Sequence, residues 1–200
     1  MTIDEIMRAA PVIPVLVLEQ EMDWAALAET FVGAGLPVLE VTLRTPLALG
    51  AIREMAKVPG AIVGAGTVLD RGQLDEAMNA GSCFIVSPGL TEGLAKAASG
   101  TPYLPGVASA GDIMRGLDLG LDRFKFFPAE AAGGIAALKA LSAPFANVRF
   151  CPTGGIRPET ARDWLALDSV LCIGGSWLKK PSDDFEAIGG RAREATALRR

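Results

Sequence analysis

The sequence contains no histidine. Histidine is the side chain that most readily exchanges a proton near neutral pH, and it is the commonest metal ligand in proteins. Its absence excludes Ser-His-Asp and Cys-His nucleophile pairs, histidine metal sites and histidine acid–base catalysis. Any chemistry must therefore use lysine, carboxylates, arginine, tyrosine, hydroxyl groups or the backbone.

Cysteine is scarce as well. The three cysteines, Cys83, Cys151 and Cys172, are odd in number, far apart and set in apolar runs. A disulfide framework or a metal cluster would show paired, regular spacing. The pattern predicts buried, reduced thiols.

Blocks of one charge and long hydrophobic runs are also missing. The formal net charge is −4 and the basic residues form no stripe, which argues against nucleic acid or an anionic membrane as a partner. Segment 1–8 is acidic and amphipathic, and the first apolar run, Val12–Leu18, is far shorter than the roughly 20 residues that cross a bilayer. We expect a cytoplasmic protein whose partner is a small molecule.

What the sequence does contain is a repeated pattern. Hydrophobic residues make up 50% of the 200 residues, and no linker or change of composition divides the chain, so residues 1–200 are predicted to form one domain. Short apolar runs recur about every 20 to 26 residues, each followed by a segment of helical length. These runs begin near Val12, Val38, Ala61, Cys83, Pro102, Arg123, Val148 and Ser169.

Eight strand–helix units in this length predict a small closed (β/α)8 barrel, the TIM-barrel architecture, rather than an open doubly wound sheet of five or six strands. The almost continuous apolar runs are typical of parallel strands covered by helices. In such a barrel the chemistry lies at the carboxyl ends of the strands. Expected helix starts are Asp23, Thr45–Pro46, Thr91 and Arg157–Pro158. Expected glycine helix ends are Gly35, Gly60, Gly81, Gly100 and Gly120.

The second strand carries polar residues on one face. Side chains alternate along a strand, so Glu40, Thr42 and Arg44 share the face that is predicted to point into the barrel. A buried carboxylate is costly unless it is paired or used in chemistry. A purely structural ion pair of Glu40 with Arg44 or a lysine is the alternative at this point.

Lys125 is the only one of six lysines that lies within an apolar strand run. Alternation places Lys125 and Phe127 toward the barrel interior and Phe124 and Phe126 toward the helices. An amine shielded from water beside Glu40 is a candidate nucleophile for a carbonyl group. The alternative is an interior lysine held only by an ion pair.

Glycine and hydroxyl residues end several other strands. Gly64 and Gly66 precede Thr67, and exposed amides beside a hydroxyl suit a carboxylate or a phosphate, although barrel strands also use glycine for packing alone. Turns at Ser87–Gly89 and Pro105–Gly106 are predicted to close the fourth and fifth strands. The last two strands end in glycine pairs, 154–155 and 174–175, the second leading into a short helix. These two loops are where this fold usually binds phosphate, unless the glycines only ease tight turns.

Six segments carry a resemblance to a known family: Leu39–Thr45, Gly64–Val68, Ser87–Gly89, Phe124–Glu130, Cys151–Ile156 and Cys172–Trp177. From about Pro11 to Arg193 the chain closely resembles the 2-keto-3-deoxy-6-phosphogluconate (KDPG) aldolases. The resemblance implies a homotrimeric class I aldolase that needs no metal or cofactor. It implies reversible cleavage of the phosphorylated 2-keto acid to pyruvate and glyceraldehyde 3-phosphate, as in the Entner-Doudoroff pathway, and possible action on 4-hydroxy-2-oxoglutarate.

The same resemblance implies a role for individual residues. Lys125 would be the Schiff-base lysine and Glu40 the general acid and base. The pyruvyl carboxylate would lie against Arg44 and Thr67, and Pro88 and Phe127 would line the pocket. The hydroxylated carbons would lie near Thr153. The phosphate would bind Gly154, Gly155, Gly175 and Ser176.

Three other functions remain open from the sequence. An aldolase for the galactonate epimer would use the same chemistry. A phosphosugar isomerase or epimerase could use the same barrel with Glu40 as its base, and it would form no borohydride-trapped adduct with pyruvate. A phosphate-ligand binding barrel would need the Glu40 and Lys125 pair to be structural only.

Overall fold

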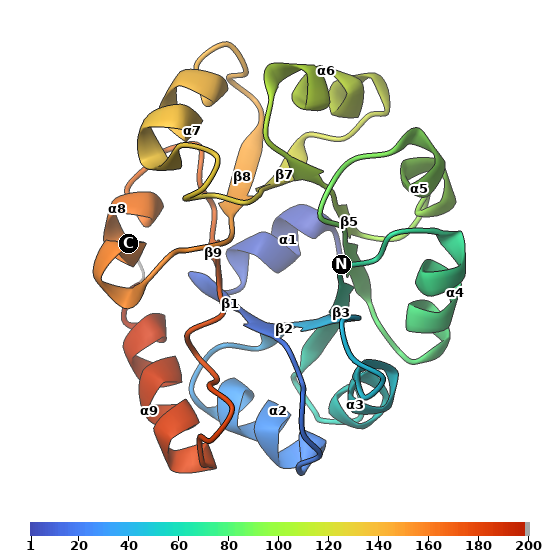
Figure 1. Ribbon diagram of the computed structural model, residues 1–200, viewed down its shortest axis with the longest axis vertical. Coiled ribbons are helices and arrows are strands. Elements are labelled where there is room, and N and C mark those ends of the chain that lie inside the picture. Colours follow the sequence, from blue (N-terminus) through green and yellow to red (C-terminus); the bar gives the residue numbers. More distant parts are fainter. Residues whose placement is uncertain (199–200) are drawn as a thin grey trace.

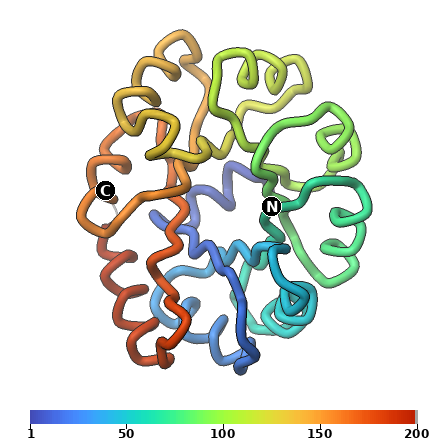
Figure 2. The backbone as a smooth tube through the Cα atoms, viewed as in Figure 1, coloured from blue at the N-terminus to red at the C-terminus, as the bar shows by residue number. Residues whose placement is uncertain are grey.

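The computed structural model describes residues 1–198. Figure 1 shows a ring of strands surrounded by helices, and Figure 2 follows the chain once around that ring. The strands are β1 Val12–Leu16, β2 Val38–Thr42, β3 Ile62–Gly66, β4 Phe84–Val86, β5 Tyr103–Leu104, β6 Gly106–Val107, β7 Arg123–Phe126, β8 Arg149–Pro152 and β9 Ile173–Gly175. The helices are α1 Ile3–Arg8, α2 Trp24–Gly33, α3 Ala48–Met55, α4 Arg71–Asn79, α5 Glu92–Ala97, α6 Ala110–Asp118, α7 Gly134–Ser142, α8 Pro158–Leu165 and α9 Phe185–Thr196.

The strands form the predicted barrel. One sheet has the order β5-β4-β3-β2-β1-β9 and the other β6-β7-β8, and all the strand pairs are parallel. Bridges from Phe150 to Val170 and from Thr153 to Gly174 join β8 to the β9 segment. Only Pro105 separates β5 from β6, so the ring is continuous there as well.

The predicted turn at Pro105–Gly106 is wrong. Tyr103 and Leu104 pair with β4, whereas Gly106 and Val107 pair with β7, so this segment is one strand that passes from one sheet to the other. The break falls at Pro105 because proline has no N–H to give to the ladder. Its carbonyl still accepts a hydrogen bond from the Lys125 amide at 2.9 Å.

Local signals explain most helix boundaries. Asp23 and Thr91 cap α2 and α5 through their side chains, and Pro158 begins α8, as predicted. All five glycines expected to end helices have positive φ. Thr45 does not cap α3, because its hydroxyl donates to the Leu18 carbonyl at 2.7 Å and the helix begins later, at Ala48.

Helix α1 lies across the amino ends of the strands and closes that end of the barrel (Figure 1). Ile6 and Met7 are buried against interior residues of several strands. Asp4 accepts a hydrogen bond from Arg123, at the start of β7, with a distance of 2.6 Å. The opposite end, at the carboxyl ends of the strands, is therefore the open one.

The cysteine prediction is correct for two residues and wrong for the third. All three thiols are free, and Cys151 and Cys172 are buried inside the barrel. Cys83 is exposed at the start of β4, although its thiol donates to the Val63 carbonyl at 3.2 Å. It lies directly before β4 and its side chain is exposed, although the apolar run predicts a buried residue. No helix among residues 1–198 is long and apolar enough to span a bilayer.

Candidate active site

Strands β2 and β7 lie on opposite sides of the ring (Figure 1), and their residues Glu40 and Lys125 meet inside the barrel. The Lys125 Nζ atom lies 2.8 Å from Glu40 Oε1, and the two residues are only 6% and 3% exposed. Strand alternation produces this arrangement, because Leu39 and Val41 pack outward in the main core while Glu40 points inward. A buried ion pair costs desolvation free energy that its attraction often fails to recover, so stability alone is a poor reason for this pair.

Glycine in β3 makes room for the carboxylate. Thr42 pairs with Gly66 in the β2–β3 register, and a Cβ atom on Gly66 would lie 2.3 Å from Glu40 Oε1. Gly64 makes similar room for the Phe84 ring, which would lie 2.4 Å from a Cβ at that position. The Gly-Ala-Gly sequence of β3 therefore has a packing reason that is specific to this site.

Phe127 lies beside Lys125, and the loop that contains Pro88 lies against β6. The Lys125 ammonium is 5.4 Å from the centre of the Phe127 ring, within the range of a cation–π contact. The carbonyl of Pro88 would lie 2.1 Å from a Cβ on Gly106, so the loop after β4 presses directly on β6. Ser87 fixes that loop through hydrogen bonds to Tyr103 and to the Gly89 carbonyl, of 2.7 and 2.6 Å.

Arg44 and Thr67 contact each other at the rim. Arg44 Nε donates to Thr67 Oγ1 at 3.3 Å. Thr67 has a φ of 60°, and within residues 1–198 it is the one non-glycine residue with positive φ. This unusual backbone conformation turns the chain directly after β3, as is common at functional sites. Arg44 and Ser176 also line one cavity of about 300 Å³, together with Glu19 and Lys179.

Thr153 and the glycine loops form the opposite part of the mouth. Thr153 is 5% exposed, and a Cβ on Gly174 would lie 2.3 Å from its Oγ1. Gly154 and Gly155 follow it with φ values of 106° and 81°. Ser176 is exposed beside Gly175, and residues 177–178 form a turn in place of the expected short helix.

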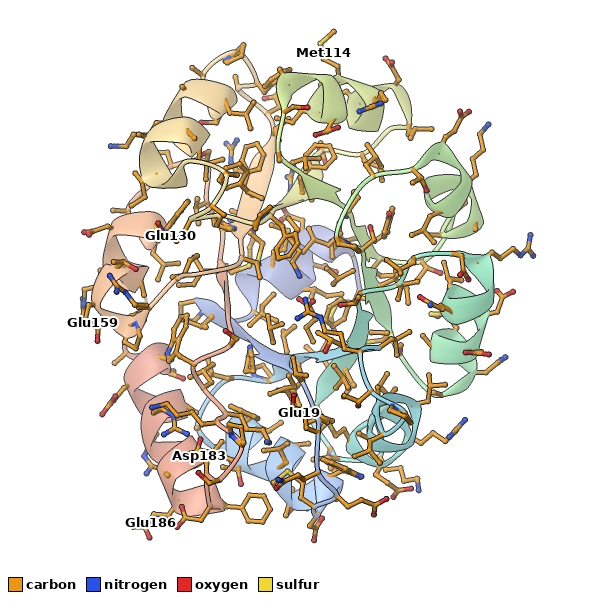
Figure 3. The ribbon with its side chains drawn as sticks, in the orientation of Figure 1. Glu19, Met114, Glu130, Glu159, Asp183 and Glu186 are labelled. Atoms are coloured by element: carbon orange, nitrogen blue, oxygen red, sulfur yellow. The ribbon has the colours of Figure 1, made fainter. Side chains whose placement is uncertain are left out.

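All the residues predicted for the site thus belong to the strands of the barrel or to the loops that follow them. The sequence left one neighbour without a role, Glu130, which accepts a hydrogen bond from Trp164 at 3.0 Å. Glu130 ends the segment Phe124–Glu130, which carries part of the family resemblance, and this position could have indicated a role for it. Figure 3 shows Glu130 beside α8, near the mouth.

A lysine and a carboxylate buried together at the mouth of a parallel barrel define a class of lyase, the aldolases that work through a lysine. Comparison with known proteins identifies the family. The model of the KDPG and KHG aldolase family matches residues 3–190. The chain belongs to this family.

Individual relatives match over almost their whole length. The chain is 57% identical to 2-dehydro-3-deoxy-phosphogluconate aldolase of Zymomonas mobilis, covering 99% of this chain and 97% of the relative. It is 54% identical to the KHG/KDPG aldolase of Escherichia coli K12, with coverages of 96% and 93%. A crystal structure of the Zymomonas mobilis KDPG aldolase, 56% identical, superposes with a TM-score of 0.97 over 100% of this chain and 98% of that one.

One solved structure shows a reaction intermediate. It is the KDPG aldolase of Legionella pneumophila, with pyruvate captured at low pH as a covalent carbinolamine. Its TM-score is 0.88 at 44% identity, over 99% of this chain and 96% of that one.

Proposed function

We propose that this chain is a class I aldolase that reversibly cleaves 2-keto-3-deoxy-6-phosphogluconate to pyruvate and D-glyceraldehyde 3-phosphate. The observation that carries the proposal is the buried contact of 2.8 Å between Lys125 Nζ and Glu40 Oε1. Membership of the KDPG and KHG aldolase family supports the choice of substrate and adds 4-hydroxy-2-oxoglutarate, which would yield pyruvate and glyoxylate.

The reaction begins at Lys125. Glu40 takes a proton from the ammonium, and the neutral amine attacks the ketone carbon to give a carbinolamine. Loss of water, with the hydroxyl protonated by Glu40, leaves a cationic imine. A carbinolamine in the Legionella pneumophila relative supports this step.

The imine then accepts the electrons of the bond that breaks. Glu40, directly or through water, removes the proton of the hydroxyl on the fourth carbon. The electron pair of the bond between the third and fourth carbons moves to the imine, giving an enamine and the free aldehyde. Glu40 returns the proton to the third carbon, and water hydrolyses the new imine to release pyruvate and Lys125.

The other residues of the mouth would hold the substrate. Arg44 and Thr67 bind the carboxylate, and the guanidinium can do so with two parallel hydrogen bonds. Pro88 and Phe127 line the pocket around the reacting carbons, and Thr153 lies near the hydroxylated carbons. The phosphate binds Ser176 and the amides of three glycines, namely Gly154, Gly155 and Gly175.

We also propose that the protein is a cytoplasmic homotrimer. The support is the resemblance of the whole chain to this family and the lack, within residues 1–198, of a helix that could span a bilayer. Sedimentation equilibrium would measure the mass of the assembly, and a species of one or two chains would exclude the trimer.

The decisive experiment is mass spectrometry after incubation with pyruvate and borohydride. We expect a reduced pyruvyl adduct on the peptide that contains Lys125, and none in a folded Lys125→Ala variant. The rate of cleavage is then compared for the gluconate and galactonate epimers. A folded wild-type protein without an adduct would reject the aldolase mechanism, and faster cleavage of the galactonate would reject the named substrate.

A further inference from the structure

Glu130 lies in the loop after β7 and contacts both the glycine loop that follows Thr153 and helix α8. The loop after β7 continues to pair with the chain beyond β8, because the Ala129 amide donates to the Thr153 carbonyl at 2.8 Å and the Glu130 amide to the Gly154 carbonyl at 3.0 Å. The backbone of Glu130 is thereby attached to the glycine loop that follows Thr153.

The side chain of Glu130 makes two further contacts. Its Oε1 accepts the hydrogen bond from Trp164 Nε1, and the Trp164 ring is fully buried on α8, with its centre 6.3 Å from that of Phe126. A Cβ on Gly155 would lie 2.8 Å from both Cβ and Cγ of Glu130. The aliphatic part of Glu130 therefore covers Gly155, while α8 holds its carboxylate.

These side-chain contacts add to the backbone hydrogen bonds that hold the glycine loop. Gly154 and Gly155 both have positive φ. Because glycine has no side chain, no contact of their own side chains holds them in this conformation. A carboxylate free to rotate toward this loop would also repel a phosphate dianion. The hydrogen bond from Trp164, which lies on α8, keeps the carboxylate of Glu130 directed toward that helix.

We propose that Glu130 is a positioning residue that holds the amides of Gly154 and Gly155 ready for the substrate's phosphate. The inference rests on the proposed function, since it deepens the assignment of this loop to the phosphate. Glu130 itself touches neither Lys125 nor the reacting carbons in this account. Its loss should therefore affect phosphorylated substrates selectively.

The test compares two substrates of the same chemistry, one with a phosphate and one without. Because a small misplacement of binding groups can reduce rate constants by up to about a hundredfold, we expect Glu130→Ala to raise KM for 2-keto-3-deoxy-6-phosphogluconate roughly tenfold. We expect kcat/KM for 4-hydroxy-2-oxoglutarate to change less than about twofold, because that substrate has no phosphate to misplace. Glu130→Gln keeps an acceptor oxygen and the packing on Gly155, so it should restore most of the KM.

Two more variants separate positioning from a general effect of charge or stability. Glu159→Ala removes an exposed carboxylate from the first turn of the same helix, α8, and should leave both substrates unchanged. Trp164→Phe removes the indole N–H but keeps a ring, and should reproduce the selective rise in KM. Circular dichroism and thermal unfolding confirm that each variant is folded.

The outcomes are distinct. Equal losses on the two substrates, or no loss on either, in a folded Glu130→Ala protein would overturn the role of Glu130. A wild-type protein that cleaves neither substrate would instead reject the proposed function.

Discussion

Lys125 Nζ lies 2.8 Å from Glu40 Oε1, although the two residues are 85 positions apart in the chain. The contact exists because β2 and β7 face each other across the barrel, with Gly66 leaving the space that the carboxylate fills.

Glu40→Gln removes the group that accepts and returns protons while preserving the shape of the side chain. Because positioned acid–base groups contribute about 10²- to 10⁴-fold, we expect kcat to fall by at least about a hundredfold. Steady-state kinetics with thermal unfolding as the folding control measures this. A folded variant with wild-type kcat would remove Glu40 from the mechanism.

Gly66→Ala should inactivate the protein although it replaces no polar side chain. The new methyl carbon would lie 2.3 Å from Glu40 Oε1, so the carboxylate must leave its place beside Lys125. Gly190→Ala in α9 is the matched control, because nothing lies within 4 Å of its Cβ. It should keep full activity and gain roughly 0.5–1 kcal/mol of stability, as alanine replaces glycine within a helix. Normal activity of Gly66→Ala would show that the site tolerates a displaced Glu40.

Arg44→Lys keeps the positive charge but loses the planar pair of donors. A lysine has one compact ammonium, which cannot bind Thr67 and a carboxylate with the geometry of a guanidinium. Loss of a charged hydrogen bond is worth about 1.5–3 kcal/mol, or roughly 10- to 100-fold in kcat/KM. The loss should be similar for phosphorylated and unphosphorylated substrates, since both carry the carboxylate. A loss confined to the phosphorylated substrate would place Arg44 at the phosphate instead.

Asp4→Asn should reveal how the closing helix is attached. Hydrogen bonds from Arg8 and Arg123 lower the pKa of the Asp4 carboxyl, against an opposing effect of partial burial. A carboxyl whose pKa is lowered by folding stabilises the fold at pH values above its pKa in the unfolded chain, near 3.8. That contribution disappears as the pH falls through its pKa in the folded protein.

The difference in free energy of unfolding between the wild-type protein and Asp4→Asn should therefore depend on pH. At pH 7, Asp4→Asn should lower the free energy of unfolding by about 0.5–1 kcal/mol, a figure kept small because the side chain is partly exposed. As the pH falls below 3.8 and through the lowered pKa of the Asp4 carboxyl, the two proteins should converge. Urea unfolding at both pH values measures it, with Asp75→Asn, from a more exposed pair, as a control that should show almost no effect. A difference that persists in acid would contradict the ionic explanation.

Thiol titration should distinguish the three cysteines. Cys83 is exposed as a residue, but its thiol is partly buried, and this burial raises the pKa of the thiol. A hydrogen bond with Cys151 and complete burial raise the pKa of Cys172 well above its usual value. A disulfide reagent should therefore modify about one thiol in the native protein, faster at higher pH, and three after unfolding. Native Cys83→Ser should react with none; rapid modification of a second thiol would contradict the burial of Cys151 and Cys172.

Much of this architecture was predictable because its signals are local. Alternation along β2 and β7 identified the inward Glu40 and Lys125, and the strand repeat predicted the barrel.

The misses have physical causes as well. The Pro105–Gly106 sequence is typical of a turn. In the structure the lack of an N–H on Pro105 only interrupts the pairing of one strand. Thr45 has a capping side chain, but the distant Leu18 carbonyl competes for its hydroxyl. The hydrogen bond between Glu130 and Trp164 joins residues 34 positions apart, and no periodic pattern encodes such a contact.

Helix α1 closes one end of the barrel, so substrates and products must pass through the other end. Ile6 and Met7 fill the amino end of the barrel, and Lys125 is buried in the interior, so the carboxyl ends of the strands are the side from which substrate would reach it. In the proposed reaction the pyruvyl fragment is bound to Lys125, and the aldehyde lies between that fragment and the open end. The pyruvyl fragment therefore cannot leave before the aldehyde. Cleavage should therefore be ordered, with the aldehyde released first and pyruvate last, and synthesis should follow the reverse order.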